Sequence, residues 1–295
     1  MSFLDRIEAA NQADLAGSRR FIIDGEPLGW VNLLMVQALS QYSDVFRVGT
    51  QHISLVPSLE AADVSERTQA VAQVTRDLYR EGLVTGWRDE LNAVISRWGE
   101  PAKLCVERAS APCLGITGFG VHMNGYVRRG TELFLWVAKR AHDKPTYPGE
   151  LDQLVAGGQP AQLGLLENLI KECDEEAGIS AELAARAKPA GMVSYATSSP
   201  LGLRPDVLFV FDLELPSDFT PRNNDGEVES FELWPVSQVL EVVSNSAKFK
   251  YNCALVVIDF LIRHGAISPE LNDYGAIVAG LRGRESFLQK YDHGR

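Results

Sequence analysis

The length and charge of the chain limit what kind of protein it can be. Its 295 residues are 45% hydrophobic and 23% charged, which supplies enough apolar material for one large domain or two modest ones. The formal net charge is −11, and no run of Lys and Arg resembles the basic stripe of a nucleic-acid-binding protein. We therefore expect no nucleic-acid partner. An acidic chain that binds a phosphorylated small molecule needs a positive group between the two, and a divalent metal ion is the simplest candidate.

The four cysteines, Cys105, Cys113, Cys173 and Cys253, are far apart and form no CxxC pair. We expect them to be small buried residues in a reducing cytosol and not zinc ligands. The N-terminal segment lacks the apolar core of a secretory signal, and no window approaches 18 uninterrupted apolar residues. These features predict a cytoplasmic protein without a membrane partner.

The first third of the chain mixes short strands with helices. Residues 19–25 and 46–57 have the composition of strands. Apolar residues recur at helical spacing over 66–84, which predicts a helix that ends near Gly82, and we expect another helix over 88–100. The pattern of predicted elements changes near residue 110, which indicates a smaller α+β domain over 1–110.

From about residue 111 the sequence becomes rich in strands. A helix that ends at Gly178 is expected within 157–180, and residues 142–160 are expected to form a loop. Strands surrounding one central helix predict an α/β layered domain over 111–265, with a mixed sheet between helices and a helical tail over 266–295. The remaining expected elements are strands within 115–127, 132–141, 190–199, 206–215 and 227–236 and helices over 237–245 and 253–265.

The segment GGQPAQLGLLENLIKECDEEAGIS, residues 157–180, gathers three glutamates near the end of its helix. At about 100° per residue, Glu172, Glu175 and Glu176 share one side, at the edge of an apolar stripe. Like charges at this spacing repel, and the last turn of a helix favours cations, so the pattern costs local stability. A solvated face is the ordinary explanation of such a run. A pattern that breaks two rules together nevertheless indicates a functional site, and carboxylates with substrate phosphates are ligands that suit Mg²⁺.

The same segment resembles the signature of the Nudix hydrolases. That signature is a Gly, five residues, a Glu, seven residues, and then Arg-Glu-apolar-x-Glu-Glu-x-Gly-apolar. The match comprises Gly157, Glu172, Glu175, Glu176 and Gly178.

Two positions depart from the family pattern. Leu163 stands where the family has its first Glu, and Lys171 stands where it has Arg. In the family this Glu and Arg brace the loop and the helix, so their joint change resembles replacement of a structural pair. Glu167, four residues before Lys171, is predicted to form a local ion pair with it.

Residues 171–179, 198–239 and 252–265 further resemble one Nudix subfamily. Its members stand alone in bacteria and plants and are fused to thiamine pyrophosphokinase in some fungi, and the likeness covers most of the chain. The resemblance implies a Nudix α/β/α sandwich and an N-terminal domain that shapes the substrate pocket. It also implies hydrolysis of thiamine diphosphate, and especially of its oxy- and oxo- analogues, to the monophosphate and phosphate.

The resemblance also implies roles for individual residues. Glu172, Glu175, Glu176 and the Gly157 carbonyl would hold roughly one to three Mg²⁺ or Mn²⁺ ions. Glu176, Glu175 or Glu227 would take the proton of the attacking water. Glu227 matches a further family glutamate that serves as metal ligand or base.

Candidate phosphate contacts lie outside the signature. Lys139, Arg140 and Arg204 stand near strand ends and loops, where cationic side chains can bind phosphate. A solvated strand edge or loop is the alternative explanation for each of them and for Glu227.

Other functions stay open at this point. The chain could cleave a different diphosphate, such as ADP-ribose or a nucleotide sugar. It could also be a degenerate Nudix domain that binds a ligand without catalysis, or a protein–protein module. The expected partner is a small-molecule diphosphate, and a monomer and a homodimer are equally compatible with the sequence.

Overall fold

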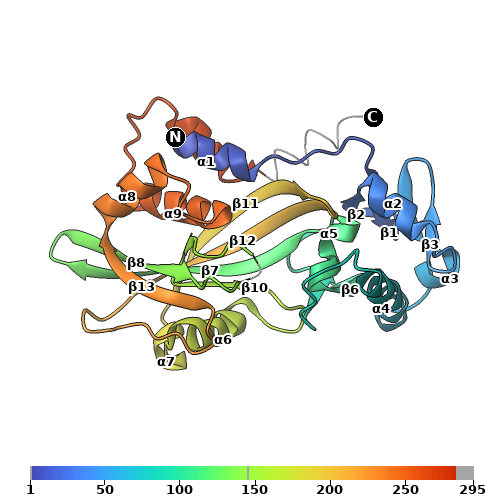
Figure 1. Ribbon diagram of the computed structural model, residues 1–295, viewed down its shortest axis with the longest axis horizontal. Coiled ribbons are helices and arrows are strands. Elements are labelled where there is room, and N and C mark those ends of the chain that lie inside the picture. Colours follow the sequence, from blue (N-terminus) through green and yellow to red (C-terminus); the bar gives the residue numbers. More distant parts are fainter. Residues whose placement is uncertain (1, 145, 284–295) are drawn as a thin grey trace.

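The computed structural model describes residues 2–144 and 146–283. Its N-terminal part is built around a four-stranded sheet of order β2-β1-β4-β3, in which β1 and β4 are parallel (Figure 1). The elements of this part are α1 (Phe3–Ala10), β1 (Arg19–Ile23), β2 (Glu26–Val31), α2 (Leu33–Leu39), β3 (Phe46–Val48), β4 (His52–Leu55), α3 (Pro57–Glu60), α4 (Val64–Arg80), β5 (Leu91–Val94), β6 (Leu104–Glu107), the 3₁₀ helix η1 (Arg108–Ser110) and α5 (Ala111–Leu114).

Helix α4 confirms the expected helix that ends near Gly82. It begins at a capping box in which Asp63 and Glu66 each accept a hydrogen bond from the other's backbone N–H. Its apolar side buries Val71, Val74 and Leu78 in the same core as the four-stranded sheet.

The expected helix over 88–100 is wrong. This segment contains the short strand β5, which pairs antiparallel with β6. Asn92 and Val94 are buried whereas Leu91 and Ala93 are partly exposed, so burial has the period of two that a strand requires. Residues 46–57 likewise form two antiparallel strands, β3 and β4, and not one.

The larger sheet has the strand order β11-β12-β7-β8-β13, and β7 is its first strand along the chain. Strands β7 and β12 are parallel and the other neighbours are antiparallel, so the sheet is mixed as expected. The expected loop over 142–160 is only partly correct, because β9 pairs with β8 and β10 pairs with β7 inside it. The strands are β7 (Gly118–Arg129), β8 (Glu132–Arg140), β9 (Leu151–Asp152), β10 (Val155–Gly158), β11 (Lys188–Ser199), β12 (Gly202–Glu214) and β13 (Val228–Pro235).

Helices cover both faces of this sheet, which confirms the α/β/α sandwich (Figure 1). One face packs against α6 (Leu165–Ala177) and α7 (Ala181–Ala184). The other face packs against α8 (Val236–Asn245), α9 (Tyr251–Arg263) and α10 (Tyr274–Gly280). Helix α1 joins this second layer, because Ile7 and Ala10 are buried in its core.

The two sheets meet through close backbone contacts. A Cβ atom on Gly29 of β2 would lie 2.3 Å from the Leu114 carbonyl oxygen, and one on Gly115 would lie 2.0 Å from that of Trp30. Gly115 also has φ +59°, a conformation that favours glycine. The Trp98 ring extends the contact by packing on Phe119 and Phe209 of the larger sheet, with centroids 5.1 and 4.8 Å away.

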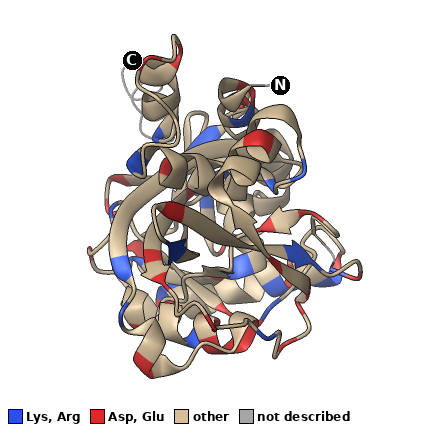
Figure 2. Cartoon of the chain, turned by 90° about the vertical axis from the view of Figure 1, so that its left-hand side faces the viewer, with Lys and Arg blue, Asp and Glu red and all other residues tan. Residues whose placement is uncertain are grey.

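Charges of both signs are mixed over the molecule. In Figure 2 the Lys and Arg positions are interspersed with Asp and Glu on this side, without a continuous basic band. Among the described residues, no helix combines the length and apolarity needed to span a bilayer.

Candidate active site

Helix α6 presents the crowded glutamates at the edge of its buried face. Leu169, Cys173 and Ala177 are fully buried against the sheet. The helix ends where Gly178 adopts φ +61°, the left-handed cap expected from the sequence. The Glu172 side chain is 13% exposed and that of Glu175 is 48% exposed, so the acids extend from a sheltered to an open position.

Lys171 neutralises part of this charge. Its Nζ lies 2.9 Å from Glu172 Oε1 and 2.8 Å from Glu175 Oε2. Burial acts to lower the pKa of Lys171, but these two carboxylates raise it overall, so the ammonium stays charged. The predicted pair with Glu167 is wrong, because Glu167 instead accepts a hydrogen bond from the Gly164 N–H at the start of the helix. Lys171 therefore reduces the repulsion between glutamates that the sequence predicts for this helix.

Glu176 is not neutralised in this way. Its Oε2 accepts a 2.7 Å hydrogen bond from the Ala156 N–H of β10. Burial raises the pKa of Glu176 well above its ordinary value, and the nearby carboxylates of Glu172, Asp152 and Glu227 raise it further. Burial also raises the pKa of Glu172, while Lys171 and then Arg108 act to lower it. These two acids would gain the most from a bound cation.

The glycine pair of β10 makes room for the acids. A Cβ atom on Gly157 would lie only 2.3 Å from Glu172 Cδ, so a side chain there would displace this carboxylate. The Gly157 carbonyl oxygen itself is directed toward β7, where a Cβ on Gly120 would lie 3.0 Å from it. Ala156 is the residue whose backbone faces Glu176, and in an extended strand its carbonyl points to the same side as its N–H.

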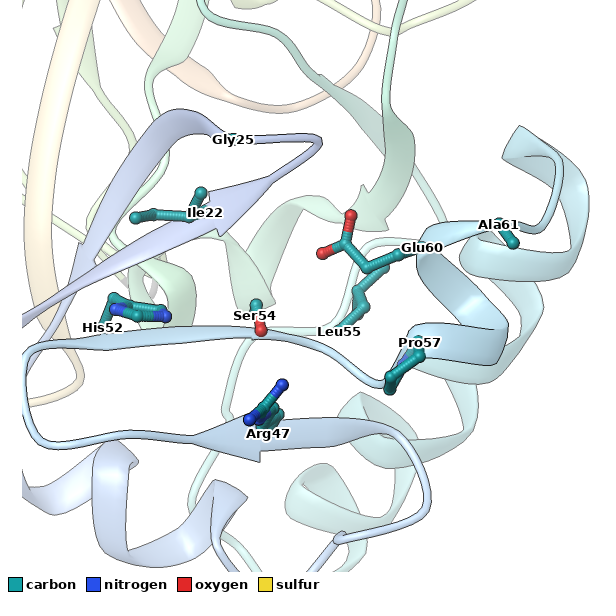
Figure 3. Close-up of a pocket in the computed structure, with 9 residues that line it drawn as sticks. All are labelled: Ile22, Gly25, Arg47, His52, Ser54, Leu55, Pro57, Glu60 and Ala61. Atoms are coloured by element: carbon teal, nitrogen blue, oxygen red, sulfur yellow. The ribbon is translucent and has the colours of Figure 1, made fainter.

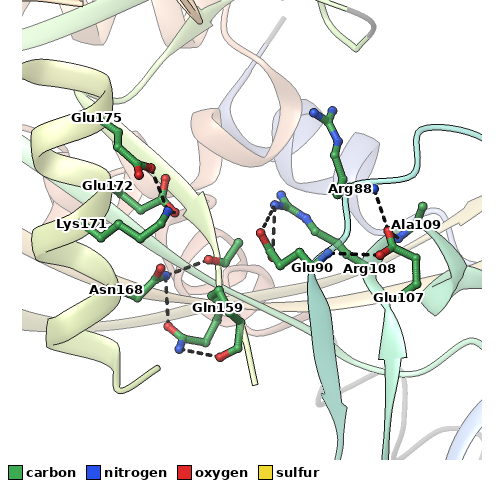
Figure 4. Close-up of polar contacts among 12 residues, drawn as sticks. Arg88, Glu90, Glu107, Arg108, Ala109, Gln159, Asn168, Lys171, Glu172 and Glu175 are labelled. Atoms are coloured by element: carbon green, nitrogen blue, oxygen red, sulfur yellow. Dashed lines mark hydrogen bonds and ion pairs between the residues drawn. The ribbon is translucent and has the colours of Figure 1, made fainter. Parts of the chain in front are cut away.

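A pair of amides braces helix α6 against the end of β10 (Figure 4). Asn168 is fully buried and its Nδ2 donates to the Gly158 carbonyl at 2.7 Å and to Gln159 Oε1 at 3.2 Å. The Gln159 Nε2 then donates to the Leu163 carbonyl at 2.6 Å. Asn168 lies on the same side of α6 as the glutamates and not among its apolar residues, so helical periodicity did not predict that it would be buried.

The other predicted site residues around β8 and β13 are already engaged. Glu227 forms an ion pair with Lys144 and lies close enough to Glu176 to raise its pKa. Lys139 pairs with Glu229 at 2.9 Å. Arg140 binds Asp152 at 2.9 Å and the carbonyls of residues 146 and 147.

Arg204 belongs to a second cluster, on the α9 side of the sheet. It lies on β12 with Asp206, whose charge raises the pKa of Arg204. Burial and then Asp206 raise the pKa values of Tyr195 and Tyr251, and the two rings pack edge to face with centroids 5.5 Å apart. Tyr147 packs on the Tyr251 ring at the same 5.5 Å centroid distance.

Asp206 is the unusual member of this cluster. Its Oδ2 is buried without a hydrogen-bond partner among residues 2–144 and 146–283. Its Oδ1 lies over Gly118, where an added Cβ would come within 2.2 Å. A buried carboxylate oxygen that is not satisfied by the protein is a site for a ligand that donates a hydrogen bond or carries positive charge.

His122, Asp152 and Cys253 form a third, fully buried group with candidate ligand atoms within 4.8 Å of one another. Arg140 and Lys250 both lie beside Asp152, at 2.9 and 4.0 Å, so a metal cation would be repelled there. Burial raises the pKa of the Cys253 thiol well above its usual range, and the thiol donates to Asp152 at 2.7 Å. We interpret this group as a structural hydrogen-bond network, in line with the expectation of structural cysteines; Cys113 and Cys173 are also buried, whereas Cys105 is half-buried.

A cavity of about 570 Å³ lies elsewhere, on the open side of the N-terminal sheet (Figure 3). Arg47, His52 and Glu60 line it together with apolar residues. None of Glu172, Glu175 and Glu176 lines this cavity. We therefore assign the candidate active site to the acids of α6 and not to this cavity.

A mixed sheet between helices, with sheltered acids on one helix facing a glycine-containing strand, places the chain in the class of α/β/α sandwich proteins with a candidate acidic metal site. Known proteins with similar sequences identify the family. Nudix hydrolase 24, chloroplastic, of Arabidopsis thaliana is 44% identical over 95% of this chain and 77% of its own length. Nudix hydrolase 20, chloroplastic, of the same plant is 42% identical over 96% of this chain and 78% of its own length.

The chain belongs to the Nudix hydrolase family, and it is a pyrophosphohydrolase. A family described as a domain of unknown function, DUF4743, matches residues 2–118. Among solved structures, a MutT protein from Methanosarcina mazei Go1 aligns with 51% of this chain and 94% of its own, at 17% identity and a TM-score of 0.39.

Proposed function

We propose that this enzyme hydrolyses the diphosphate of thiamine diphosphate or of its oxidised analogues, giving the monophosphate and phosphate, with Mg²⁺ or Mn²⁺ as cofactor. The observation that carries the proposal is the pair of sheltered, incompletely neutralised acids, Glu172 and Glu176, against the bare Cα of Gly157. The free cysteines fit the reducing cytoplasm that we also propose.

The residues on this side of α6 fit a divalent cation. Glu172 and Glu176 would hold it, with Glu175 available at the exposed end and the carbonyl of Ala156 as the backbone oxygen that faces them. The role of Gly157 in this arrangement is to leave room for the Glu172 carboxylate. When bound, the ion would neutralise the diphosphate and make the attacking water more acidic.

The proton of the attacking water requires a base near these acids. Glu227 directly precedes β13, lies close enough to Glu176 to raise its pKa, and is held by an ion pair with Lys144. We propose Glu227, Glu176 or Glu175 for this role. The sheltered position of Glu176 favours proton uptake, because burial already raises its pKa.

The cluster on the α9 side supports a substrate whose organic part is a flat, positively charged or N–H-rich ring. Tyr147 and Tyr251 offer aromatic surfaces, and the buried Tyr195 ring packs edge to face on Tyr251. Asp206 offers a carboxylate oxygen that lacks a partner within the described chain. The aminopyrimidine and thiazolium rings of thiamine have this chemistry. Arg204 stands beside Asp206 and is available to a phosphate or ring acceptor.

A panel of diphosphates tests the proposal. Phosphate or nucleotide release would be measured with Mg²⁺ or Mn²⁺ for thiamine diphosphate, its oxy- and oxo- analogues, ADP-ribose and a nucleotide sugar. We expect at least about tenfold higher kcat/KM for the thiamine-type compounds, and Asp206→Asn should lower that preference. Equal or faster turnover of ADP-ribose would instead support the broader nucleotide-diphosphate activity. Binding without any hydrolysis would support a ligand-binding module.

A further inference from the structure

Arg108 reaches the candidate active site from the N-terminal part of the chain (Figure 4). It is the first residue of η1, directly after β6. Its guanidinium lies on the backbone of β10, where a Cβ atom on Gly158 would come within 2.6 Å of Arg108 Cζ. Only a glycine at position 158 leaves room for this side chain.

The segment that carries Arg108 is held firmly. The buried Glu107 carboxylate accepts hydrogen bonds from the backbone N–H groups of Arg88, Glu90 and Ala109, at 2.9, 3.2 and 3.1 Å. The Arg108 N–H donates to the Glu90 carbonyl at 2.8 Å. These hydrogen bonds fix the backbone at Arg108, so the point from which its side chain extends is better defined than in an ordinary surface arginine.

The position of Arg108 places it on the same face of the sheet as Asp206. Gly157 and Gly158 are consecutive strand residues, so Glu172 and Arg108 approach β10 from opposite faces. Gly158 pairs with Gly120 of β7, and Asp206 lies over Gly118, two residues away on the same face. Three glycines, Gly118, Gly120 and Gly158, thus lie between Asp206 and Arg108, and Leu208 Cδ2 lies 3.2 Å from the Cβ position of Gly120. Arg108 and Glu176 both approach β10, on Gly158 and on the Ala156 N–H.

Arg108 holds its own carboxylate partner only loosely. Its Nη1 lies 3.4 Å from both carboxylate oxygens of Glu90, and its side chain is 43% exposed. Four cations near the acids or on β8 have closer carboxylate partners, namely Lys139 with Glu229, Arg140 with Asp152, Lys144 with Glu227, and Lys171 with Glu172 and Glu175. Lys250 is buried beside Asp152, at 4.0 Å.

We propose that Arg108 binds the diphosphate of the substrate, so that the N-terminal domain supplies part of the active site. This inference depends on the proposed diphosphate activity. The guanidinium offers planar paired donors, which match two oxygens of one phosphate group. The organic ring would lie toward Asp206, and the diphosphate would lie at β10, between Arg108 and the acids of α6.

The test compares Arg108→Ala, Arg108→Lys and the control Arg88→Ala, which removes an exposed arginine from the same segment. Calorimetry measures binding of methylenediphosphonate, a diphosphate that resists hydrolysis, in the presence of Mg²⁺. We expect Arg108→Ala to weaken binding at least about tenfold, because a charge-assisted hydrogen bond is lost. Arg108→Lys should weaken it less, and Arg88→Ala should stay within about twofold of the wild type.

Two further readouts separate a binding role from a structural one. Mn²⁺ affinity and the melting temperature should be unchanged in Arg108→Lys, while KM for thiamine diphosphate rises. If the wild type binds the probe and Arg108→Ala binds it equally well, the inference is wrong while the proposed function stands. If the wild type neither binds the probe nor hydrolyses any diphosphate, both are wrong.

Discussion

Gly157 shows at the scale of one residue how a missing side chain creates the site. The Glu172 carboxyl group occupies the volume that any other side chain at position 157 would need. Each acid on α6 has its own surroundings, because Lys171 is shared between Glu172 and Glu175, whereas Glu176 accepts the Ala156 N–H. The site therefore depends on the neighbours of each acid and not only on their number.

Gly157→Ala should lower kcat/KM by about 10²-fold, because displacing the Glu172 carboxylate, the proposed metal ligand, by about an ångström would have an effect of this size. The new Cβ would lie 2.3 Å from Glu172 Cδ. Steady-state kinetics and Mn²⁺ titration would both report the change. Gly164→Ala is the control, since nothing lies within 4 Å of its added Cβ. Wild-type Mn²⁺ affinity in Gly157→Ala would contradict the assigned role.

Glu176→Gln should be more stable than the wild type at neutral pH in EDTA. Burial raises the pKa of Glu176 above its ordinary 4.5, so the folded state holds this proton to higher pH than the unfolded state. Stability is therefore lost as the pH rises through the folded pKa, and each unit by which the pKa is raised is worth about 1.4 kcal/mol.

Urea unfolding between pH 4.5 and 8 measures this difference, which should be small at the acid end and grow with pH. Glu175→Gln, at a site 48% exposed, should change stability by less than about 0.5 kcal/mol. A Glu176→Gln protein that is no more stable than the wild type across this range would show that ionising Glu176 does not destabilise the folded state.

At the scale of elements, α6 is fixed to β10 by amides. Asn168 and Gln159 connect the helix, the strand end and the turn at Leu163 through neutral hydrogen bonds. The start of α6 is thus positioned without a charge close to the acids of its last turns.

Asn168→Ala should lower the free energy of unfolding by about 1–3 kcal/mol, because the buried Gly158 carbonyl and Gln159 amide oxygen lose their donor. Chemical denaturation measures the loss, and activity should fall with it as the helix moves. Asn224→Ala is the matched control, since the Asn224 side chain is exposed and also donates to a main-chain carbonyl, that of Asp174. Equal effects of the two substitutions would contradict the brace.

At the scale of the whole molecule, the N-terminal sheet is attached to the larger sheet close to the residues that enter the site. The contact between Gly29 and Leu114 lies a few residues after Arg108, and Trp98 covers Phe119 at the start of β7. This arrangement explains physically how a domain that carries none of the signature acids can contribute to the site.

Gly29→Ala should destabilise the protein by about 1–3 kcal/mol or more through overpacking, because its Cβ would lie 2.3 Å from the Leu114 carbonyl oxygen. Thermal unfolding measures the stability, and diphosphate binding should weaken as Arg108 loses its position. Gly275→Ala has open space around its Cβ and serves as the control. A Gly29→Ala protein with wild-type melting temperature would contradict this account of the junction.

The sequence predicted the elements whose signal is local and missed those that depend on distant partners. The long strands and α6 follow from periodicity and from the cap at Gly178. The short strands β5 and β10 exist because they pair with β6 and β7, which no local pattern encodes. Arg108 and Asp206 were missed for the same reason, since tertiary contacts bring them to the glycines of β7 and β10. Lys171 has Glu167, Glu172 and Glu175 within four residues, and sequence spacing alone did not decide which of them it would bind.

The most direct test of the central claim is a calorimetric titration of the metal-free protein with Mn²⁺, comparing the wild type with Glu172→Gln/Glu176→Gln. The account predicts saturable uptake by the wild type and a loss of affinity of at least about tenfold in the double variant, because its two sheltered carboxylates become neutral amides. Absence of Mn²⁺ uptake by the wild type, or equal uptake by both proteins, would contradict the claim that these acids hold a divalent cation.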